Sequence, residues 1–438
     1  MRGILTAVAA SMLFISNAQG YGLEDLAVRP RKPSAQALPD IPPDASSEQL
    51  WRELQKLEGF TGFSTDPQTT SPIDRAVQVG LRSLAWLAHV NASRPADQQL
   101  SYTSKATTGG IPIDKPSEYS PVIVGDRLDK IQSEIPSALG AVLFSGQSFP
   151  TVLPVPDPEF IDWGLKLDKV YQTALRWRLM ENWLSWLAQN RAKDVRGYYF
   201  LNLLTEAERE ARLQDVRRLS EADRTQVMDW VVQLCMNSRG ATSACQADVA
   251  GAFQRDGDLR SIYKENWASA ERLYRGFFAI PAGAVRGDVN FQNPIQTILP
   301  FLNPGRADVL DFLRDNIEDE WKFGPWRLTL DFTSQARARV EFVSGATPHV
   351  NGLGGDIITM NADQPLTEYD AQWTIRHEFG HVLGLPDCYV EFYEEDRGVI
   401  VTYQIDIDNL MCSRHGHIQE RHVDELRRVY SPTPVTQH

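Results

Sequence analysis

Residues 374–387 read TIRHEFGHVLGLPD and guide the interpretation of the whole chain. In this stretch His377 and His381 stand four positions apart, and Glu378 directly follows the first histidine. A helix is predicted to carry them, beginning at Thr367, whose side chain can cap its first turn. Side chains four residues apart on a helix lie one turn above each other. The two imidazoles therefore face the same way and can bind one ion.

Gly384 and Asp387 extend this pattern beyond the helix. Gly384 can end the helix in the left-handed conformation that residues with a β-carbon avoid. The turned chain would bring Asp387 back toward the ion as a third ligand. Zinc suits such a set, because imidazole is a preferred ligand and three protein ligands plus a water form a catalytic site. We therefore predict Zn²⁺ held by His377, His381 and Asp387, with Glu378 as general base toward the water.

Further segments of the chain carry a family resemblance. Residues 409–413 read NLMCS and place a lone methionine between polar stretches. This turn and the pattern H-E-x-x-H-x-x-G-x-x-D together resemble the metzincin clan of zinc endopeptidases, and the final aspartate resembles its snapalysin-type members. Residues 352–360 resemble the active-site strand of matrixins, and residues 419–430 resemble the clan's last helix. The resemblance covers about residues 276–438.

The resemblance implies a role for each residue of the motif. His377, His381 and Asp387 carry over as metal ligands, Glu378 as the general base, and Met411 as the methionine beneath the metal. The implied reaction is hydrolysis of peptide bonds in a protein or peptide substrate. The Gly-rich strand that precedes the helix could pair with an extended substrate as an added strand.

The chain departs from the clan's pattern in two places. Asp387 stands where the clan usually has a third histidine, and an aspartate after a proline is also a common turn residue. Ser413 stands where several families place a tyrosine near the metal. Tyr389, Tyr393 and Tyr403 are unproven substitutes for that tyrosine.

A second choice of third ligand remains open. Glu420 and Asp424 form an E-x-x-x-D pair of the kind that supplies this ligand in thermolysin-like enzymes, but that arrangement leaves the glycine turn and the methionine without a role. Three more histidines, His415, His417 and His422, follow the methionine. They could offer a metal ligand or an oxyanion donor, but we interpret them as solvated loop residues.

The chain has four cysteines, and their pairing bears on the site. Joining each to its nearer neighbour gives Cys235–Cys245 and Cys388–Cys412, and the alternative is four buried free thiols. The second disulfide would join the residue after Asp387 to the residue after Met411. It would then hold the third ligand and the methionine turn in register.

The N-terminal residues predict export. Residues 1–20 have a basic start, a short apolar run and small residues that allow cleavage near Ala18 or Gly20, as in a secretory signal peptide. The apolar run is too short to cross a bilayer, and no other segment is long and apolar enough. Residues 21–46 follow as a Pro-rich leader. We expect a secreted or periplasmic protein without stable membrane insertion, in a compartment where disulfides form.

The remaining chain divides into two predicted domains. Residues 47–275 show mainly helical spacing and residues 276–438 mix helical and alternating patterns. An amphipathic helix is predicted over 306–322. Alternation of apolar and polar residues then predicts strands at 326–332, 338–342 and 356–360. The predicted fold class is α+β: a metzincin-like catalytic domain, with a twisted sheet and the zinc helix beneath it, after a mainly α-helical N-terminal domain.

Charge and composition narrow the function classes. The formal net charge of -13 argues against a nucleic-acid partner, which requires a basic face. A secreted zinc endopeptidase is the leading hypothesis. The alternatives are a binding or scaffolding protein with a structural zinc site and a zinc hydrolase of non-peptide substrates. Residues 47–275 are either an inhibitory pro-region or a permanent accessory domain.

Overall fold

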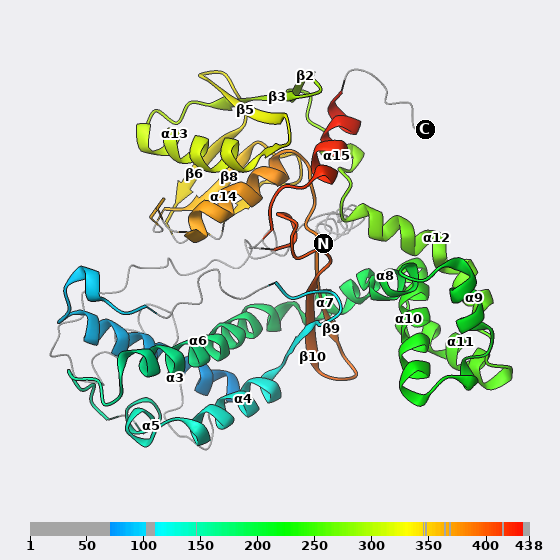
Figure 1. Cartoon of the computed structure of the whole chain (residues 1–438), viewed down its shortest axis with the longest axis horizontal. Coiled ribbons are helices and arrows are strands. Elements are labelled where there is room, and N and C mark those ends of the chain that lie inside the picture. The colour runs from blue at the N-terminus through cyan, green and yellow to red at the C-terminus, as the bar shows by residue number, and fades with distance from the viewer. Residues whose placement is uncertain are drawn as a thin grey trace, which may run out of the picture.

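The computed structural model describes residues 71–101, 110–145, 147–344, 346, 348–362, 365–367, 369–413 and 416–431. The predicted signal peptide, the leader and residues 47–70 lie outside this part of the chain. Figure 1 shows a sheet lobe above two helical lobes, with a β-hairpin descending between the helical lobes. We call residues 71–195 the first helical lobe and residues 196–276 the second.

The first helical lobe consists of helices packed around one apolar core. Its helices are α3 (Pro72–Asn91), α4 (Pro121–Glu134), α5 (Ser137–Leu143), α6 (Asp157–Met180) and α7 (Leu184–Asn190). Ser71 and Ser120 cap α3 and α4, and each serine precedes a proline that suits the first helical position. The core includes Trp86, Leu128, Leu139, Leu167 and Leu187.

The second helical lobe has a core of its own. Its helices are α8 (Arg196–Asn202), α9 (Glu206–Gln214), α10 (Glu221–Arg239), α11 (Thr242–Arg255) and α12 (Arg260–Gly276). Thr205 and Glu208 form a capping box at the start of α9. The core includes Val227, Val231, Leu234, Leu259 and Ala270. The region predicted as one helical domain therefore contains two separately packed cores.

The sheet lobe contains a mixed sheet. Its strands are β2 (Asn290–Asn293), β3 (Gln296–Leu302), β4 (Lys322–Phe323), β5 (Trp326–Thr333), β6 (Arg339–Val343), β7 (His349–Val350) and β8 (Ile357–Asn361). β3 is parallel to β5, β6 is parallel to β8, and a parallel bridge between Phe301 and Ala338 links the two sets. The three predicted strands are confirmed as β5, β6 and β8, whereas β2, β3, β4 and β7 were not predicted.

Two helices cover the sheet from the same side (Figure 1). The predicted helix over 306–322 is confirmed as α13 (Ala307–Leu313), continued by a π-turn at Arg314–Glu318. The motif helix is α14 (Tyr369–Val382). Trp321 and Phe379 meet edge to face between them, with ring centroids 5.7 Å apart and both side chains fully buried. Apolar packing against the sheet thus holds α14 in place.

Strand β8 lies in the middle of its sheet. It pairs with β6 on one edge and with β7 on the other, where His349 and Val350 face Thr359 and Ile358. The expectation that this strand accepts a substrate strand is therefore wrong over Ile358–Thr359, because both edges are already hydrogen-bonded there. The strand beside it, β7, forms the edge of this three-stranded sheet.

A hairpin from the C-terminal part of the chain packs into the helical lobes. Strands β9 (Tyr389–Glu394) and β10 (Val399–Gln404) pair antiparallel, and β10 pairs with β1 (Ser117–Tyr119) from the first helical lobe. Ile400 belongs to the core of that lobe. Other hairpin residues form a cluster with residues of the helical lobes, among them Val195, Val390, Phe392, Val401 and Tyr403. The last helix, α15 (Glu420–Tyr430), returns to the sheet lobe.

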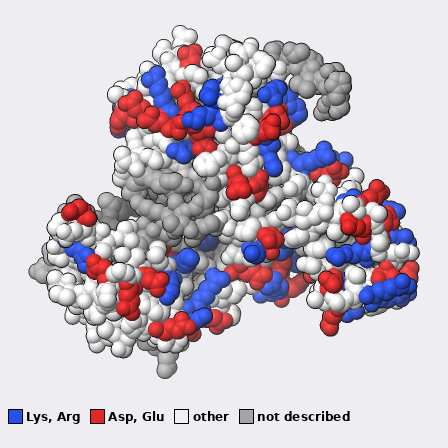
Figure 2. Space-filling view, in the orientation of Figure 1, with Lys and Arg blue, Asp and Glu red and all other residues white. Residues whose placement is uncertain are grey.

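The architecture is α+β, as predicted at the level of class. Lys and Arg side chains are interspersed with Asp and Glu on the face in Figure 2 rather than gathered by sign. A search of the described helices finds none with the length and apolar character needed to cross a membrane.

Candidate metal centre

Helix α14 presents both histidines of the motif at a buried position. His377, Glu378 and His381 are 1%, 1% and 6% exposed. Phe379 on the opposite side of the helix is fully buried in the core of the sheet lobe. The ring of Trp373 stacks on His377 at a centroid distance of 4.9 Å, which restricts the plane of that imidazole.

Gly384 makes the turn that follows the helix. Its φ is +88°, in the left-handed region, and its N–H donates to the carbonyl of His381 at 2.9 Å. A β-carbon at this position would lie 2.8 Å from the carbonyl oxygen of Ala284. Both the backbone conformation and the close approach therefore require glycine. The predicted role of Gly384 as the helix terminator is confirmed.

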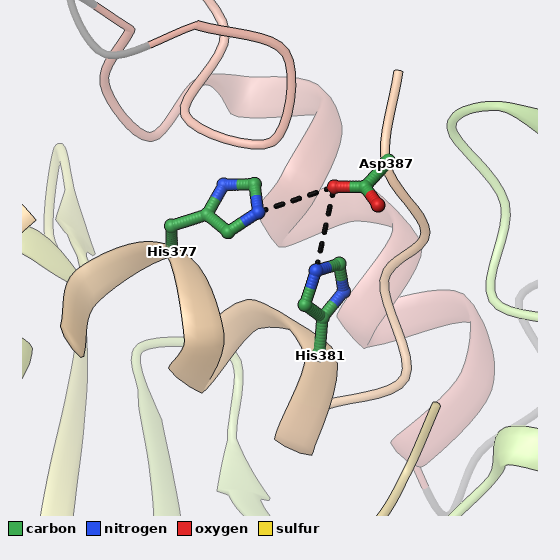
Figure 3. A group of neighbouring side chains, drawn as sticks. All are labelled: His377, His381 and Asp387. Carbon is green, nitrogen blue, oxygen red and sulfur yellow. Dashed lines mark ion pairs between the residues drawn. The ribbon is translucent and has the colours of Figure 1, made fainter. Parts of the chain in front are cut away.

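The turn brings Asp387 to the two histidines (Figure 3). Its Oδ1 lies 3.1 Å from Nε2 of His377 and 3.4 Å from Nε2 of His381. Tetrahedral zinc with bonds of about 2.0–2.1 Å separates its ligand atoms by roughly 3.3 Å. The potential ligand atoms of the three residues all lie within 4.8 Å of one another. The three predicted ligands thus come together in space.

Backbone carbonyls orient both imidazoles. Nδ1 of His377 lies 3.0 Å from the carbonyl oxygen of Leu410, and Nδ1 of His381 lies 2.8 Å from that of Leu385. A carbonyl can only accept, so each Nδ1 carries the proton. Nε2 of each ring then faces Asp387 and is the nitrogen that can bind a metal. Such outer hydrogen bonds are the usual way in which proteins fix the tautomer of a metal-binding histidine.

The electrostatics of the cluster favour a cation. Nε2 of His377 and both carboxylate oxygens of Asp387 are buried and make no well-directed hydrogen bond within the described residues. Neutral imidazole and carboxylate present lone pairs to each other, which is unfavourable unless a cation or a proton lies between them. Without a metal ion, a proton on the imidazoles fills this place: burial raises the pKa of the Asp387 carboxyl, but attraction to His381 and the hydrogen bond from His377 outweigh burial, so the pKa lies below its ordinary value. A divalent metal ion fits this donor set.

Met411 packs directly beneath the motif helix. A β-carbon at Gly380, between the two histidines, would lie 2.2 Å from its sulfur. Asn409 holds the methionine turn, since its Oδ1 accepts from the N–H of Met411 at 2.8 Å and lies 3.0 Å from Nε2 of His422. The interpretation of His422 as a solvated loop residue is wrong: it is 3% exposed. Sequence reasoning missed these supports because no local pattern links Gly380, Asn409 and His422.

Both predicted disulfides are confirmed. Cys388–Cys412 joins the residue after Asp387 to the residue after Met411, with Cα atoms 4.5 Å apart. The N–H of Cys388 also donates to the carbonyl of Met411 at 3.1 Å. This disulfide therefore ties the third candidate ligand to the methionine turn. Cys235–Cys245 joins α10 to α11 in the second helical lobe.

The other candidates from the sequence lie elsewhere. Glu420 and Asp424 are exposed on α15 and do not belong to the buried group of potential ligands. Tyr403 hydrogen-bonds within the helical lobes, and Tyr393 packs on Trp177 at a ring distance of 6.4 Å. His417 keeps a side-chain exposure of 73%, and His415 lies outside the described residues.

A cavity of about 600 Å³ adjoins the cluster. Asp387 lines it, and so do residues of the sheet lobe, both helical lobes and the hairpin, including Leu353, Lys193, Arg272 and Tyr389. Asp387 is therefore the member of the candidate cluster that borders this cavity, which the helical lobes help to enclose. No protein-family model matches this chain, and no curated protein or solved structure matches it significantly.

Proposed function

We propose that this protein is a zinc-dependent endopeptidase of metzincin type, with His377, His381 and Asp387 as ligands and Glu378 as general base. The observation that carries the proposal is the buried cluster in which Nε2 of both imidazoles lies 3.1 and 3.4 Å from one carboxylate oxygen of Asp387. The turn at Gly384 and the methionine packed beneath Gly380 add to its support.

The chemistry divides between the ion and the chain. When bound, zinc supplies a Lewis acid that polarises water and the substrate carbonyl. Glu378 follows the first ligand on the same helix and is 1% exposed. Its carboxylate takes the proton of the attacking water and returns it to the departing amine. Asp387 and the two imidazoles contribute one formal negative charge, so the ion and its three ligands would together keep one net positive charge, which favours an electron-rich carbonyl oxygen.

Access to the cluster favours catalysis over a structural zinc site. Structural zinc sites are usually closed by four protein ligands, whereas catalytic sites keep one position open. The described residues bring three potential ligands together here, and Asp387 lines a cavity of about 600 Å³. An exported enzyme is also part of the proposal, because its two disulfides are bonds that persist in oxidising compartments.

The test separates metal binding from catalysis. Metal analysis should find about one zinc per chain; Asp387→Ala should lose most of it, while the matched control Glu420→Ala, on exposed α15, should keep it. Glu378→Gln should retain zinc and thermal stability but slow the cleavage of a mixed peptide pool by about 10²–10⁴-fold. If the wild-type protein binds zinc yet cleaves no peptide, the remaining hypotheses are a binding protein with a structural zinc site and a zinc hydrolase of non-peptide substrates. Equal cleavage by Glu378→Gln would refute the role of Glu378.

A further inference from the structure

The cavity beside Asp387 has an unusual balance of charge. Its charged lining residues are Asp387, Glu391, Lys193 and Arg272. Asp387 belongs to the candidate metal cluster. The carboxylate of Glu391 is 2% exposed and is neutralised by Arg176, whose Nε donates to it at 3.1 Å; the hydroxyl of Tyr119 donates to it as well. The two cations are therefore the charges of this lining that remain available to a ligand.

Lys193 is the more deeply placed of the two. Within the part of the chain that the structure describes, its ammonium has no hydrogen bond or ion pair. Burial lowers the pKa of Lys193, which shows that its charged form is poorly solvated. A carboxylate brought into the cavity would offset this cost.

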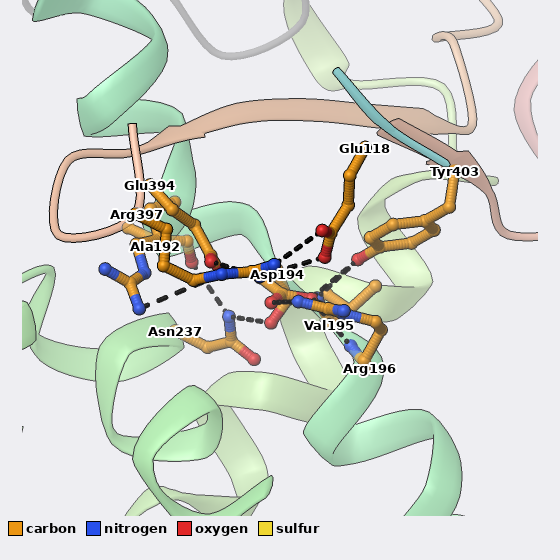
Figure 4. Close-up of polar contacts among 10 residues, drawn as sticks. Glu118, Ala192, Asp194, Val195, Arg196, Asn237, Glu394, Arg397 and Tyr403 are labelled. Carbon is orange, nitrogen blue, oxygen red and sulfur yellow. Dashed lines mark hydrogen bonds and ion pairs between the residues drawn. The ribbon is translucent and has the colours of Figure 1, made fainter. Parts of the chain in front are cut away.

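The backbone around Lys193 is held on both sides (Figure 4). The side-chain amide of Asn237 donates to the carbonyl of Ala192 at 2.8 Å and to that of Asp194 at 2.9 Å. The carboxylate of Asp194 in turn binds Arg196 and accepts from the hydroxyl of Tyr403. The backbone that carries Lys193 is thus fixed, so little backbone entropy is lost when Lys193 binds a ligand.

Arg272 supplies a second cation from another lobe. It lies on α12, and within the described residues its guanidinium donates a hydrogen bond of 3.2 Å to the hydroxyl of Ser269. Its guanidinium is more exposed than Lys193 and so is better solvated. A planar guanidinium and an ammonium can receive one carboxylate together.

We propose that this cavity is a specificity subsite that binds a carboxylate of the peptide substrate through Lys193 and Arg272. The inference rests on the proposed peptidase function, because it takes the adjoining cluster as the place of cleavage. The carboxylate can belong to an acidic side chain or to the C-terminus of the peptide, and the experiment distinguishes these sources.

Binding is measured apart from cleavage. Fluorescent peptides are titrated into zinc-loaded Glu378→Gln protein, and their fluorescence anisotropy gives Kd. The parent peptide contains glutamine and ends in an amide; one set replaces each position in turn by glutamate, and another peptide keeps glutamine but has a free C-terminus. We expect a carboxylate in the right place to bind about 10-fold to 100-fold more tightly than the parent, the range of a charged hydrogen bond. Raising the ionic strength should weaken this preference.

Substitutions of Lys193 and Arg272 then test whether these two side chains cause the preference for a carboxylate. Lys193→Met keeps the apolar stem and removes the charge, and it should abolish most of the preference without loss of zinc or stability. Arg272→Met should reduce it less, because solvent screens this more exposed group. Lys193→Glu should move the preference to lysine-containing peptides. The matched control is Lys130→Met, which removes an exposed charge from α4 and should change nothing.

The outcomes separate this proposal from the peptidase proposal. Carboxylate binding that depends on Lys193 in a protein that cleaves no peptide supports the subsite and refutes the peptidase. Cleavage without any preference for a carboxylate leaves the peptidase standing and overturns the subsite. Equal binding of all peptides, no binding at all, or a preference that survives the double variant Lys193→Met/Arg272→Met also overturns it.

Discussion

Helix α14 and the β9–β10 hairpin are neighbours in the chain but are held by different parts of the molecule. The helix packs inside the sheet lobe, where Ile375 and Phe379 are fully buried. The hairpin begins at Tyr389 and packs into the helical lobes. Asp387 lies at the junction between them. The position of one candidate ligand therefore depends on both regions, whereas the two histidines depend on the sheet lobe alone.

The two regions also differ in the kind of interaction that holds them. Around α14 the contacts are mainly apolar, supported by carbonyl hydrogen bonds to the histidines. In the hairpin, buried polar side chains are matched to partners in the first helical lobe: the Glu391 carboxylate pairs with Arg176, and the Tyr403 hydroxyl donates to Asp194. Attraction to Glu391 raises the pKa of Arg176 above its ordinary value although burial opposes it. Such pairs position a segment closely, and they are costly to break.

The largest expected effect comes from separating the regions. Residues 276–438 expressed alone would expose apolar hairpin side chains that are at most 3% exposed in the whole protein, among them Val390, Phe392, Ile400, Val401 and Tyr403. At about 1.5–3 kcal/mol each, their exposure costs roughly 10 kcal/mol, comparable with the stability of a whole domain. We expect this fragment to be insoluble or to unfold without a cooperative transition by circular dichroism.

The second helical lobe provides the contrast. Residues 196–276 have their own core and their own disulfide, and we expect them to fold alone with a cooperative thermal transition. A stable, cooperatively folding 276–438 fragment would contradict the dependence of the sheet lobe on the helical lobes. If the 276–438 fragment does not fold alone, a permanent accessory role for the helical lobes is favoured over a removable pro-region.

A medium effect is expected at the ion pair of the hairpin, in which the Glu391 carboxylate is buried and the Arg176 side chain is 37% exposed. Glu391→Gln leaves the Arg176 guanidinium without its counter-charge, and we expect a loss of about 3 kcal/mol in the free energy of unfolding. The matched control is Glu118→Gln, which removes the partner of Arg397 from an exposed pair with side-chain exposures of 52% and 33%. That substitution should cost less than about 1 kcal/mol. Urea denaturation of both variants measures the difference, and equal losses would argue that burial of the pair is unimportant.

The smallest effect concerns the sheet lobe and depends on pH. Burial lowers the pKa of His422 from 6.5 to about 4, so the folded protein keeps this ring neutral. Between pH 6.5 and 4 the histidine of the unfolded chain binds a proton more readily than His422 of the folded protein. Protonation therefore favours unfolding: the contribution of neutral His422 to stability is complete above about pH 6.5 and is lost as the pH falls toward 4. At pH 5 the loss is about 2 kcal/mol.

His422→Gln removes the titrating ring and keeps a donor for Asn409. Stability curves of wild type and variant should therefore diverge between pH 6.5 and 4, the variant falling less steeply. Parallel curves over this range would show that His422 is not held neutral in the folded protein.

The metal motif was predictable because its geometry is local. The helix places His377 over His381, and the glycine turn returns Asp387 within six residues of the second histidine. Both disulfides were predictable for a related reason, as each joins cysteines that are near in sequence. Such features depend on backbone rules that any surrounding fold must obey.

Strand β3 and the hairpin escaped prediction because both faces of each strand carry apolar residues, so alternation is hidden. Pro300 also argued against a strand. It is tolerated because it falls between Ile298, the last residue paired with β2, and Phe301, which bridges to Ala338. The missing N–H is thus not needed at that point.

The sequence by itself determined the candidate ligand set, the turn that assembles it and the two disulfides, since each follows from spacing along one segment. Only the tertiary structure decided which residues enclose the cavity beside Asp387 and which charges line it. Lys193 and Arg272 reach the cavity from helices far from the motif, and Glu391 meets Arg176 across 215 positions of sequence. Contacts over such separations depend on how the lobes pack, because no periodic pattern in a single chain encodes which distant surfaces meet.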